Sequence, residues 1–241
     1  MQVEAGALVR QTAERFGDRT ALTAQARSLS FADLNAAANR VGSAVLELGA
    51  RRGDRVGVLA YETPEVVEAW FGFEKHNVVR AVLHSHFPMD AHVASLNHIQ
   101  ASTLIFDTRF TEQLDAVRGD LTSVRHLVAV GPDTPDWATA FTDLEDGGDP
   151  EDPYLDVDEG APCFLQLTSG TTGQPKAWVK TYRSWAAVIN HNLHHFDTFG
   201  PGVPPVGEDD VNLHFHPIQW AGGFQTLYPY FLALVTHPWV R

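Results

Sequence analysis

Cysteine is almost absent from this sequence of 241 residues, because Cys163 is the only one. A single cysteine excludes an intrachain disulfide and makes a reducing compartment the default. Cys163 lies in an apolar run with Phe164 and Leu165, and no cationic residue stands beside it. No neighbour in the sequence would lower the pKa of this thiol, so we expect it to be buried in a strand rather than to act as a nucleophile.

Basic residues are also scarce, with 17 Lys and Arg against 30 Asp and Glu and a formal net charge of -13. Such an acidic chain repels phosphate backbones and anionic lipids, which argues against nucleic acid or an anionic membrane surface as the main partner. The acidic excess lies before residue 161, because 161–241 holds four basic and four acidic residues. An anionic nucleotide would be repelled least by this last part.

Long hydrophobic runs are missing from the sequence. The longest apolar-rich run, 224–235, is too short to span a bilayer and contains Pro229. The amino-terminal residues 1–4 have neither the basic start nor the apolar core of a signal peptide. We therefore expect no membrane span and a cytoplasmic protein.

Two common nucleotide-binding motifs are absent. No G-x-G-x-x-G follows any predicted strand, so a dinucleotide-binding Rossmann site has no support. The Walker loop requires G-x-x-x-x-G-K followed by Ser or Thr, whereas here the spacing is G-x-x-G-x-P-K and Ala177 follows the lysine. A P-loop phosphotransferase is therefore disfavoured. Release of phosphate from ATP without any acid substrate would indicate such an enzyme.

Helical and extended periodicity alternate along the chain. An amphipathic helix is expected over 3–16, and a capping-box start at Ser30 predicts a second helix that stops at Gly49. The alternation that follows predicts an α/β fold with mostly parallel sheets, right-handed crossovers and helices on both faces. The predicted strands are 20–24, 55–60, 78–83, 103–106, 126–130, 177–180 and 211–215, and the remaining predicted helices are 64–76, 90–101, 109–117 and 182–196.

An acidic segment separates two parts of the chain. Residues 143–160 hold nine acidic side chains, no basic ones, two adjacent glycines and two prolines. This composition is typical of an exposed connector, and a solvated linker is favoured over a partner-binding patch. We therefore expect an α/β subdomain over 1–142, an acidic connector over 143–160, and the start of a nucleotide-binding subdomain over 161–241.

Residues 168–176 carry the clearest chemistry in the chain. The run T-S-G-T-T-G-Q-P-K combines four hydroxyls, two glycines that permit close approach and positive φ, and one lysine. Closely packed hydroxyls and backbone amides beside a positive charge are what a polyphosphate and its magnesium ion require. The pattern therefore predicts a polyphosphate-binding loop. Its predicted ligand-binding members are Thr168, Ser169, Gly170, Thr171, Thr172, Gly173 and Lys176.

This string closely resembles the signature loop of the adenylate-forming superfamily, which includes acyl- and aryl-CoA synthetases, the adenylation domains of nonribosomal peptide synthetases, and luciferases. The order of helices and strands before the loop also resembles the amino-terminal half of an acyl-CoA synthetase large domain. The resemblance implies a reaction in which a carboxylic acid and ATP give an acyl-adenylate and pyrophosphate, after which a thiol takes the acyl group. Thr168 would then help to hold Mg²⁺, residues 169–173 would bind the β- and γ-phosphates, and Lys176 would be the catalytic lysine that screens these oxygens or fixes the loop.

A second segment, 217–223, resembles the P-L-F-H-x-x-G segment of acyl-CoA synthetases, whose aromatic position lines the acid pocket. Here Gln219 replaces the usual aromatic residue and Trp220 stands where a histidine is common. The bulky indole favours a pocket shaped for a flat or small acid, although core packing explains Trp220 equally well. The resemblance thus implies that Gln219, Trp220, Gly222 and Gly223 bind the acid, and it leaves the acid unnamed.

The twelve histidines invite a metal interpretation. His84 and His86, and again His214 and His216, have the spacing that places two side chains on one side of a strand. A helical turn holds three further histidines at 191, 194 and 195. No cysteine or close carboxylate completes a ligand set with this last group, so the pattern disfavours a structural zinc site.

The resemblance implies ATP, Mg²⁺ and coenzyme A as cofactors, with a carrier-protein phosphopantetheine as the alternative thiol. Members of the superfamily continue into an adenine pocket, an acidic residue on the ribose, and a small mobile carboxy-terminal lid with a second lysine. None of these can be located before Arg241. We therefore expect an amino-terminal portion of a longer acid–thiol ligase that cannot complete adenylation by itself. The alternative is a non-catalytic nucleotide-binding or scaffold module that keeps only the loop.

Overall fold

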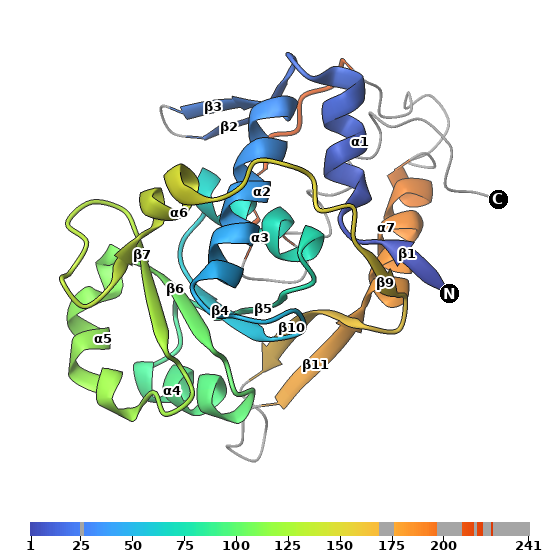
Figure 1. Cartoon of the computed structure of the whole chain (residues 1–241). Helices are drawn as coiled ribbons and strands as arrows, with labels where there is room; N and C mark the ends of the chain where they lie inside the picture. The colour runs from blue at the N-terminus through green and yellow to red at the C-terminus, as the bar shows by residue number, and fades with distance from the viewer. Residues whose placement is uncertain (25–26, 169–175, 197–208, 215, 219–222, 224–241) are drawn as a thin grey trace.

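A computed structural model describes residues 1–24, 27–168, 176–196, 209–214, 216–218 and 223 (Figure 1). The helices are α1 Ala7–Phe16, α2 Phe31–Glu47, α3 Pro64–Lys75, α4 Met89–His98, α5 Thr111–Val117, α6 Phe141–Gly147 and α7 Tyr182–Phe196, with 3-10 turns η1 Thr108–Phe110 and η2 Arg118–Asp120. The strands are β1 Gln2–Glu4, β2 Thr20–Ala24, β3 Arg27–Ser30, β4 Arg55–Leu59, β5 Val79–Val82, β6 Thr103–Asp107, β7 His126–Val130, β8 Thr139–Ala140, β9 Asp156–Asp158, β10 Pro162–Thr168 and β11 Lys176–Thr181.

The centre of the fold is a seven-stranded sheet in the order β11-β10-β5-β4-β6-β7-β8. Every neighbouring pair from β10 to β8 is parallel, and β11 alone runs antiparallel at the edge. Helices α2 and α3 cover one face of the sheet, and α4 and α5 cover the other (Figure 1). The predicted α/β fold with a mostly parallel sheet and helices on both faces is confirmed.

The apolar strands explain why both faces are covered. In β6, Leu104 and Phe106 belong to the core under α4 and α5, whereas Ile105 between them belongs to the core under α2 and α3. All three side chains are fully buried. Successive side chains of a strand point to opposite faces, so a strand that is apolar at every position needs a helix layer on each side.

The start and the end of α2 follow from local sequence. The Ser30 hydroxyl accepts a hydrogen bond from the Asp33 amide at 3.0 Å, and the Asp33 carboxylate accepts one from the Ser30 amide at 3.3 Å. This is the predicted capping box. The helix ends before Gly49, whose φ of 110° lies in the left-handed region that glycine tolerates.

The amino-terminus differs from the prediction. The helix expected over 3–16 begins only at Ala7, because Val3 pairs with Val157 in the antiparallel β1–β9 ladder. Gly6 makes the turn between strand and helix with a φ of 62°. A β-carbon at Gly6 would lie 2.9 Å from the α-carbon of Lys75, so this turn also requires close approach to α3.

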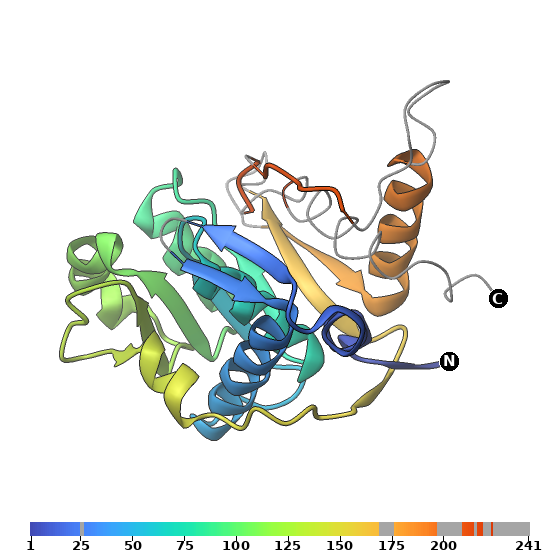
Figure 2. The ribbon, with the colours of Figure 1, turned by 90° about the horizontal axis from the view of Figure 1, so that it is seen from above.

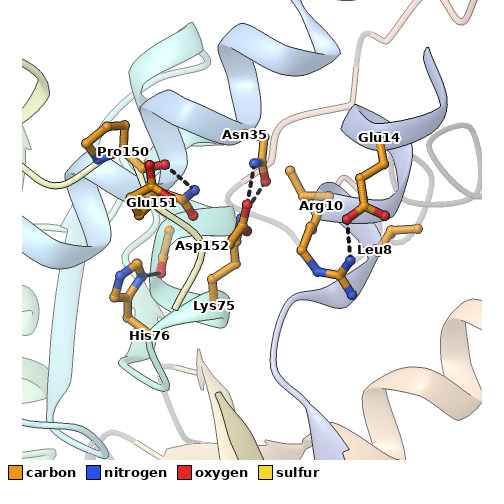
Figure 3. Close-up of polar contacts among 12 residues, drawn as sticks. Leu8, Arg10, Glu14, Asn35, Lys75, His76, Pro150, Glu151 and Asp152 are labelled. Atoms are coloured by element: carbon orange, nitrogen blue, oxygen red, sulfur yellow. Dashed lines mark hydrogen bonds and ion pairs between the residues drawn. The ribbon is translucent and has the colours of Figure 1, made fainter. Parts of the chain in front are cut away.

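The acidic segment 143–160 is attached to the first part of the chain at several points. Leu144 of α6 is buried, and β9 pairs with β1. Between them, Asp152 forms an ion pair with the buried ammonium of Lys75, which also donates to Asn35 of α2 (Figure 3). The strand that follows, β10, pairs with β5 in the central sheet. The domain boundaries drawn from composition stay a prediction.

One predicted strand, 211–215, is wrong for the residues that can be compared. Residues 211–214 form no strand, and Val211 and Leu213 are 94% and 84% exposed. An alternating pattern forms a strand only where one face is buried against a core, and these two side chains are not. Of the helices in the described ranges, none has both the length and the apolar character that crossing a bilayer would require.

Candidate functional site

The predicted phosphate loop is carried by a hairpin. Strands β10 and β11 are antiparallel neighbours, and their register pairs Leu167 with Ala177 and Thr168 with Lys176. Two of the predicted site residues therefore stand opposite each other, one on each strand, and the ammonium side chain of Lys176 is exposed. The other predicted loop members lie outside the described residues. They are Ser169, Gly170, Thr171, Thr172 and Gly173.

The hairpin stands at the carboxyl edge of the parallel sheet. Because β10 runs parallel to β5, and β5 parallel to β4, Thr168 emerges at the edge where all three strands end. The chain passes from β4 to β5 on one side and then crosses to β6 on the other side of β4. Open α/β sheets bind ligands at this edge, near the strand where the order reverses. The hairpin stands at this ligand-binding edge, with β5 between it and β4.

Two buried histidines lie beyond the end of β5. Strand β5 ends at Val82, so His84 and His86 lie in the following turn and not on one face of a strand as predicted. His84 packs on Phe87 with ring centroids 5.1 Å apart, and His92 of α4 is only 2% exposed. Burial lowers the pKa of both imidazoles, that of His92 to about 4. These side chains are therefore neutral at pH 7.

An arginine that the sequence analysis did not single out lies at the end of β6. Arg109 donates to both carboxylate oxygens of Asp107, at 2.8 and 2.6 Å, and its guanidinium lies 3.9 Å from the centre of the Tyr61 ring. Tyr61 in turn stacks on Phe110. The carboxylate of Asp107 raises the pKa of Arg109, which fixes a positive charge at the carboxyl edge of the sheet. An Asp at a strand end followed two residues later by Arg was the available signal.

The second predicted segment is described at three of its residues. Ile218 is buried in the core shared with α2 and α3, and Pro217 before it is exposed. A β-carbon at Gly223 would lie 2.2 Å from the carbonyl oxygen of Pro217, so glycine is required where the segment returns to its own start. The other predicted acid-binding residues, Gln219, Trp220 and Gly222, lie outside the described residues.

Cys163 has the environment that the sequence predicts. Its side chain is fully buried in β10, and its thiol donates to the Lys180 carbonyl oxygen at 3.2 Å. Burial raises the pKa of this thiol to about 12, which keeps it protonated and unreactive. The interpretation of Cys163 as a buried strand residue is confirmed.

Ligands for a structural metal are not assembled in the described ranges. Within them, no group of three or more histidine, cysteine or carboxylate side chains could hold a metal ion. Of the histidine sets noted in the sequence, His214 and His216 stand outside any strand.

Comparisons with known proteins agree with this architecture. A family profile described as AMP-binding enzyme matches residues 9–237. A 3-methylmercaptopropionyl-CoA ligase of Ruegeria lacuscaerulensis is 31% identical over 161 residues, which cover 64% of this chain and 30% of that protein. A crotonobetaine/carnitine–CoA ligase of Salmonella paratyphi A is 29% identical over 216 residues, which cover 85% of this chain and 40% of that protein.

The solved structure of an anthranilate CoA ligase in complex with anthranoyl-AMP has the same fold, with a TM-score of 0.84 at 22% identity. The match covers 96% of this chain and 44% of that one. This chain thus spans less than half the length of each of these three relatives. Because the family profile covers the sequence almost from end to end, the predicted resemblance is confirmed and the chain belongs to the family of AMP-binding enzymes.

Proposed function

We propose that the protein containing this chain is an acid–thiol ligase that forms an acyl-adenylate from a carboxylic acid and ATP, releases pyrophosphate, and transfers the acyl group to a thiol, with coenzyme A as the preferred acceptor. One observation carries the proposal. The hairpin of β10 and β11 presents Thr168 and Lys176 opposite each other at the carboxyl edge of the sheet. Several of the similar proteins are named CoA ligases, and one solved neighbour is described as ATP-bound.

The residues at the ends of the hairpin suit a magnesium–polyphosphate group. A threonine hydroxyl is a hard oxygen ligand for Mg²⁺, and an exposed lysine ammonium is a compact cation for phosphate oxygens. In this proposal Thr168 holds the metal, and Lys176 is the catalytic lysine. Backbone amides and hydroxyls of 169–173 bind the β- and γ-phosphates. The magnesium ion, when bound, neutralises phosphate charge.

The chain's own residues would supply positioning and charge. Attack of a carboxylate on the α-phosphorus of ATP brings two anions together, so the site must hold them in line and screen their repulsion. Lys176 serves the second need. Acid binding is assigned to the segment with Gln219, Trp220, Gly222 and Gly223, which leads from the buried Ile218. The adenine pocket, the second metal ligand and a mobile lid domain are assigned to parts of the polypeptide outside these 241 residues.

A cytoplasmic location is part of the same proposal. The single cysteine is a buried free thiol, which suits a reducing compartment, and ATP is the proposed substrate.

The test is acid-dependent ATP–pyrophosphate exchange by the protein as its source organism produces it, screened with a panel of small aliphatic and aromatic acids. Lys176→Met should lower the exchange rate about a hundredfold, because a charge that screens the β- and γ-phosphates of the leaving pyrophosphate is lost. Lys180→Met is the matched control, since Lys180 lies on the same strand but away from the loop end, and it should retain the wild-type rate. MgATP binding without exchange by any acid would point instead to a non-catalytic nucleotide-binding module.

A further inference from the structure

Arg80 is a buried cation in an otherwise apolar strand. It lies within β5, between Val79 and Ala81, and its side chain is fully buried. Removing a guanidinium from water is energetically unfavourable unless its new surroundings compensate. A charge in this position therefore indicates a specific arrangement of the groups around it.

Aromatic rings supply most of these surroundings. The guanidinium carbon of Arg80 lies 3.6 Å from the centre of the Trp70 ring and 5.0 Å from that of Phe164. Trp185 meets Phe164 edge to face, with ring centroids 4.9 Å apart and an interplanar angle of 85°. Trp70 and Trp185 are themselves 6.4 Å apart. We call Trp70, Arg80, Phe164 and Trp185 the cation–aromatic cluster.

Hydrogen bonds contribute little to the orientation of Arg80. Its Nη2 donates to the Glu74 carboxylate at 3.4 Å, which is long for a charged pair. Its Nε and Nη1 atoms have no hydrogen-bond partner in the described part of the chain. The planar stack on Trp70 therefore fixes the guanidinium, and a lysine ammonium cannot reproduce such a stack.

The cation–aromatic cluster connects the elements on either side of the β10–β11 hairpin to the rest of the fold. Phe164 lies on β10, before the loop, and is the register partner of Arg80 on β5. Trp185 lies on α7, which follows β11 after the loop and flanks the β10–β11 end of the sheet (Figure 2). At the start of α7, the Tyr182 hydroxyl donates to the Glu74 carbonyl oxygen at 2.9 Å. The base of the hairpin is thus attached through both of its flanking elements.

We propose that the cation–aromatic cluster sets the direction of the β10–β11 hairpin, and that Arg80 is a positioning residue for MgATP at the loop. The inference rests on the proposed function. Four residue steps separate Phe164 from Thr168 at the end of β10, which is about 13 Å of extended strand. A tilt of about 4° at the base would then move Thr168, where the loop begins, by about 1 Å, a displacement that can weaken a positioned interaction as much as a hundredfold.

The experiment compares two double variants in the protein as its source organism produces it. Arg80→Met with Glu74→Gln replaces the buried cation and its carboxylate by neutral side chains of similar size. The control, Lys75→Met with Asp152→Asn, likewise replaces an ion pair by neutral side chains. This pair connects α3 to the segment before β9 rather than to the hairpin (Figure 3). Isothermal titration calorimetry gives the Kd for MgATP, at a temperature well below both melting temperatures.

We expect the Arg80 double variant to bind MgATP about tenfold more weakly than wild type, and the Lys75 double variant to stay within twofold. Arg80→Lys keeps the charge but loses the stack, so it should bind as weakly as the Arg80 double variant. If the Arg80 double variant fails to fold, Phe164→Leu is the alternative. It removes one ring of the cluster with little change of volume and should also weaken MgATP binding.

The possible failures are distinguishable. Wild-type protein that does not bind MgATP overturns the proposed function and this inference together. Wild-type binding that the Arg80 and Phe164 variants retain in full overturns the inference alone. An equal loss in the Arg80 and Lys75 double variants also overturns it, because the effect would then come from general destabilisation.

Discussion

The stability of this protein should fall as pH rises, because of Glu68 on α3. Its side chain is fully buried, and its carboxylate lies 2.9 Å from the guanidinium of Arg27. The same guanidinium also serves Glu65 at 2.9 Å and Glu145 at 2.8 Å. One positive charge cannot compensate three carboxylates. Burial and the charge of Glu145 therefore raise the pKa of Glu68 from 4.5 to about 8.

The sign follows from proton binding. Between pH 4.5 and about 8 the folded protein holds a proton on Glu68 that the unfolded chain has released. The stabilisation from this bound proton is fully present below pH 4.5. It is lost as pH rises from 4.5 through about 8, by up to about 1.4 kcal/mol of unfolding free energy for each pH unit. Glu68→Gln keeps the shape and hydrogen-bonding groups of the protonated acid without a titrating proton. We expect it to match wild type near pH 5 and to be more stable by at least about 2 kcal/mol at pH 8.5.

Urea unfolding, followed by tryptophan fluorescence at constant ionic strength from pH 5 to pH 9, measures this difference. Glu65→Gln is the control, because Glu65 stands on the same helix and pairs with the same arginine but is partly exposed. Its difference from wild type should change by less than about 1 kcal/mol over the range. A difference between Glu68→Gln and wild type that stays flat with pH, or that favours wild type at pH 8.5, would refute the reasoning.

Three further predictions concern the cap, the second segment and the thiol. Ser30→Ala removes the capping box and should lower the free energy of unfolding by about 1 kcal/mol, whereas Ser28→Ala in β3 should change it by less than about 0.5 kcal/mol in the same urea titrations. Gly223→Ala forces a methyl group against the Pro217 carbonyl and should raise the KM for the acid more than that for ATP, as steady-state exchange kinetics would show. Cys163 should react with iodoacetamide only at the rate of unfolding, and rapid labelling of native protein at pH 8 would contradict its burial.

Local patterns predicted most of the fold. The capping box of α2 could be predicted because the two residues that form it are only three positions apart. The strand from Leu104 to Phe106 could be predicted because a run of apolar residues is buried by whichever helices cover the two faces of the sheet. The pairing of Thr168 with Lys176 is of the same kind, because a short loop between two strands brings its ends together. The position of the two loop ends thus follows from the sequence, whereas their role in binding phosphate stays a prediction.

Long-range pairing decided what the sequence did not predict. Val3 leaves the expected helix because its strand partner, Val157, lies 154 positions later in the sequence. Residues 211–214 show an alternating pattern but form no strand, because their apolar side chains are not buried. A helical or alternating pattern indicates which structures a segment can form. Which of them it adopts depends on contacts with segments that are distant in the sequence.

Arg80 is a case in which a long-range contact can be recognised from the local sequence. An apolar strand in a parallel sheet is buried on both faces, so a charge within it must find compensation from other segments of the chain. The compensation here comes from Trp70 on α3 and Phe164 on β10, together with the Glu74 carboxylate. A single charge inside a predicted buried strand therefore predicts a long-range contact before its partners are known. In this protein that contact joins β10, the strand before the predicted phosphate loop, to β5 in the central sheet.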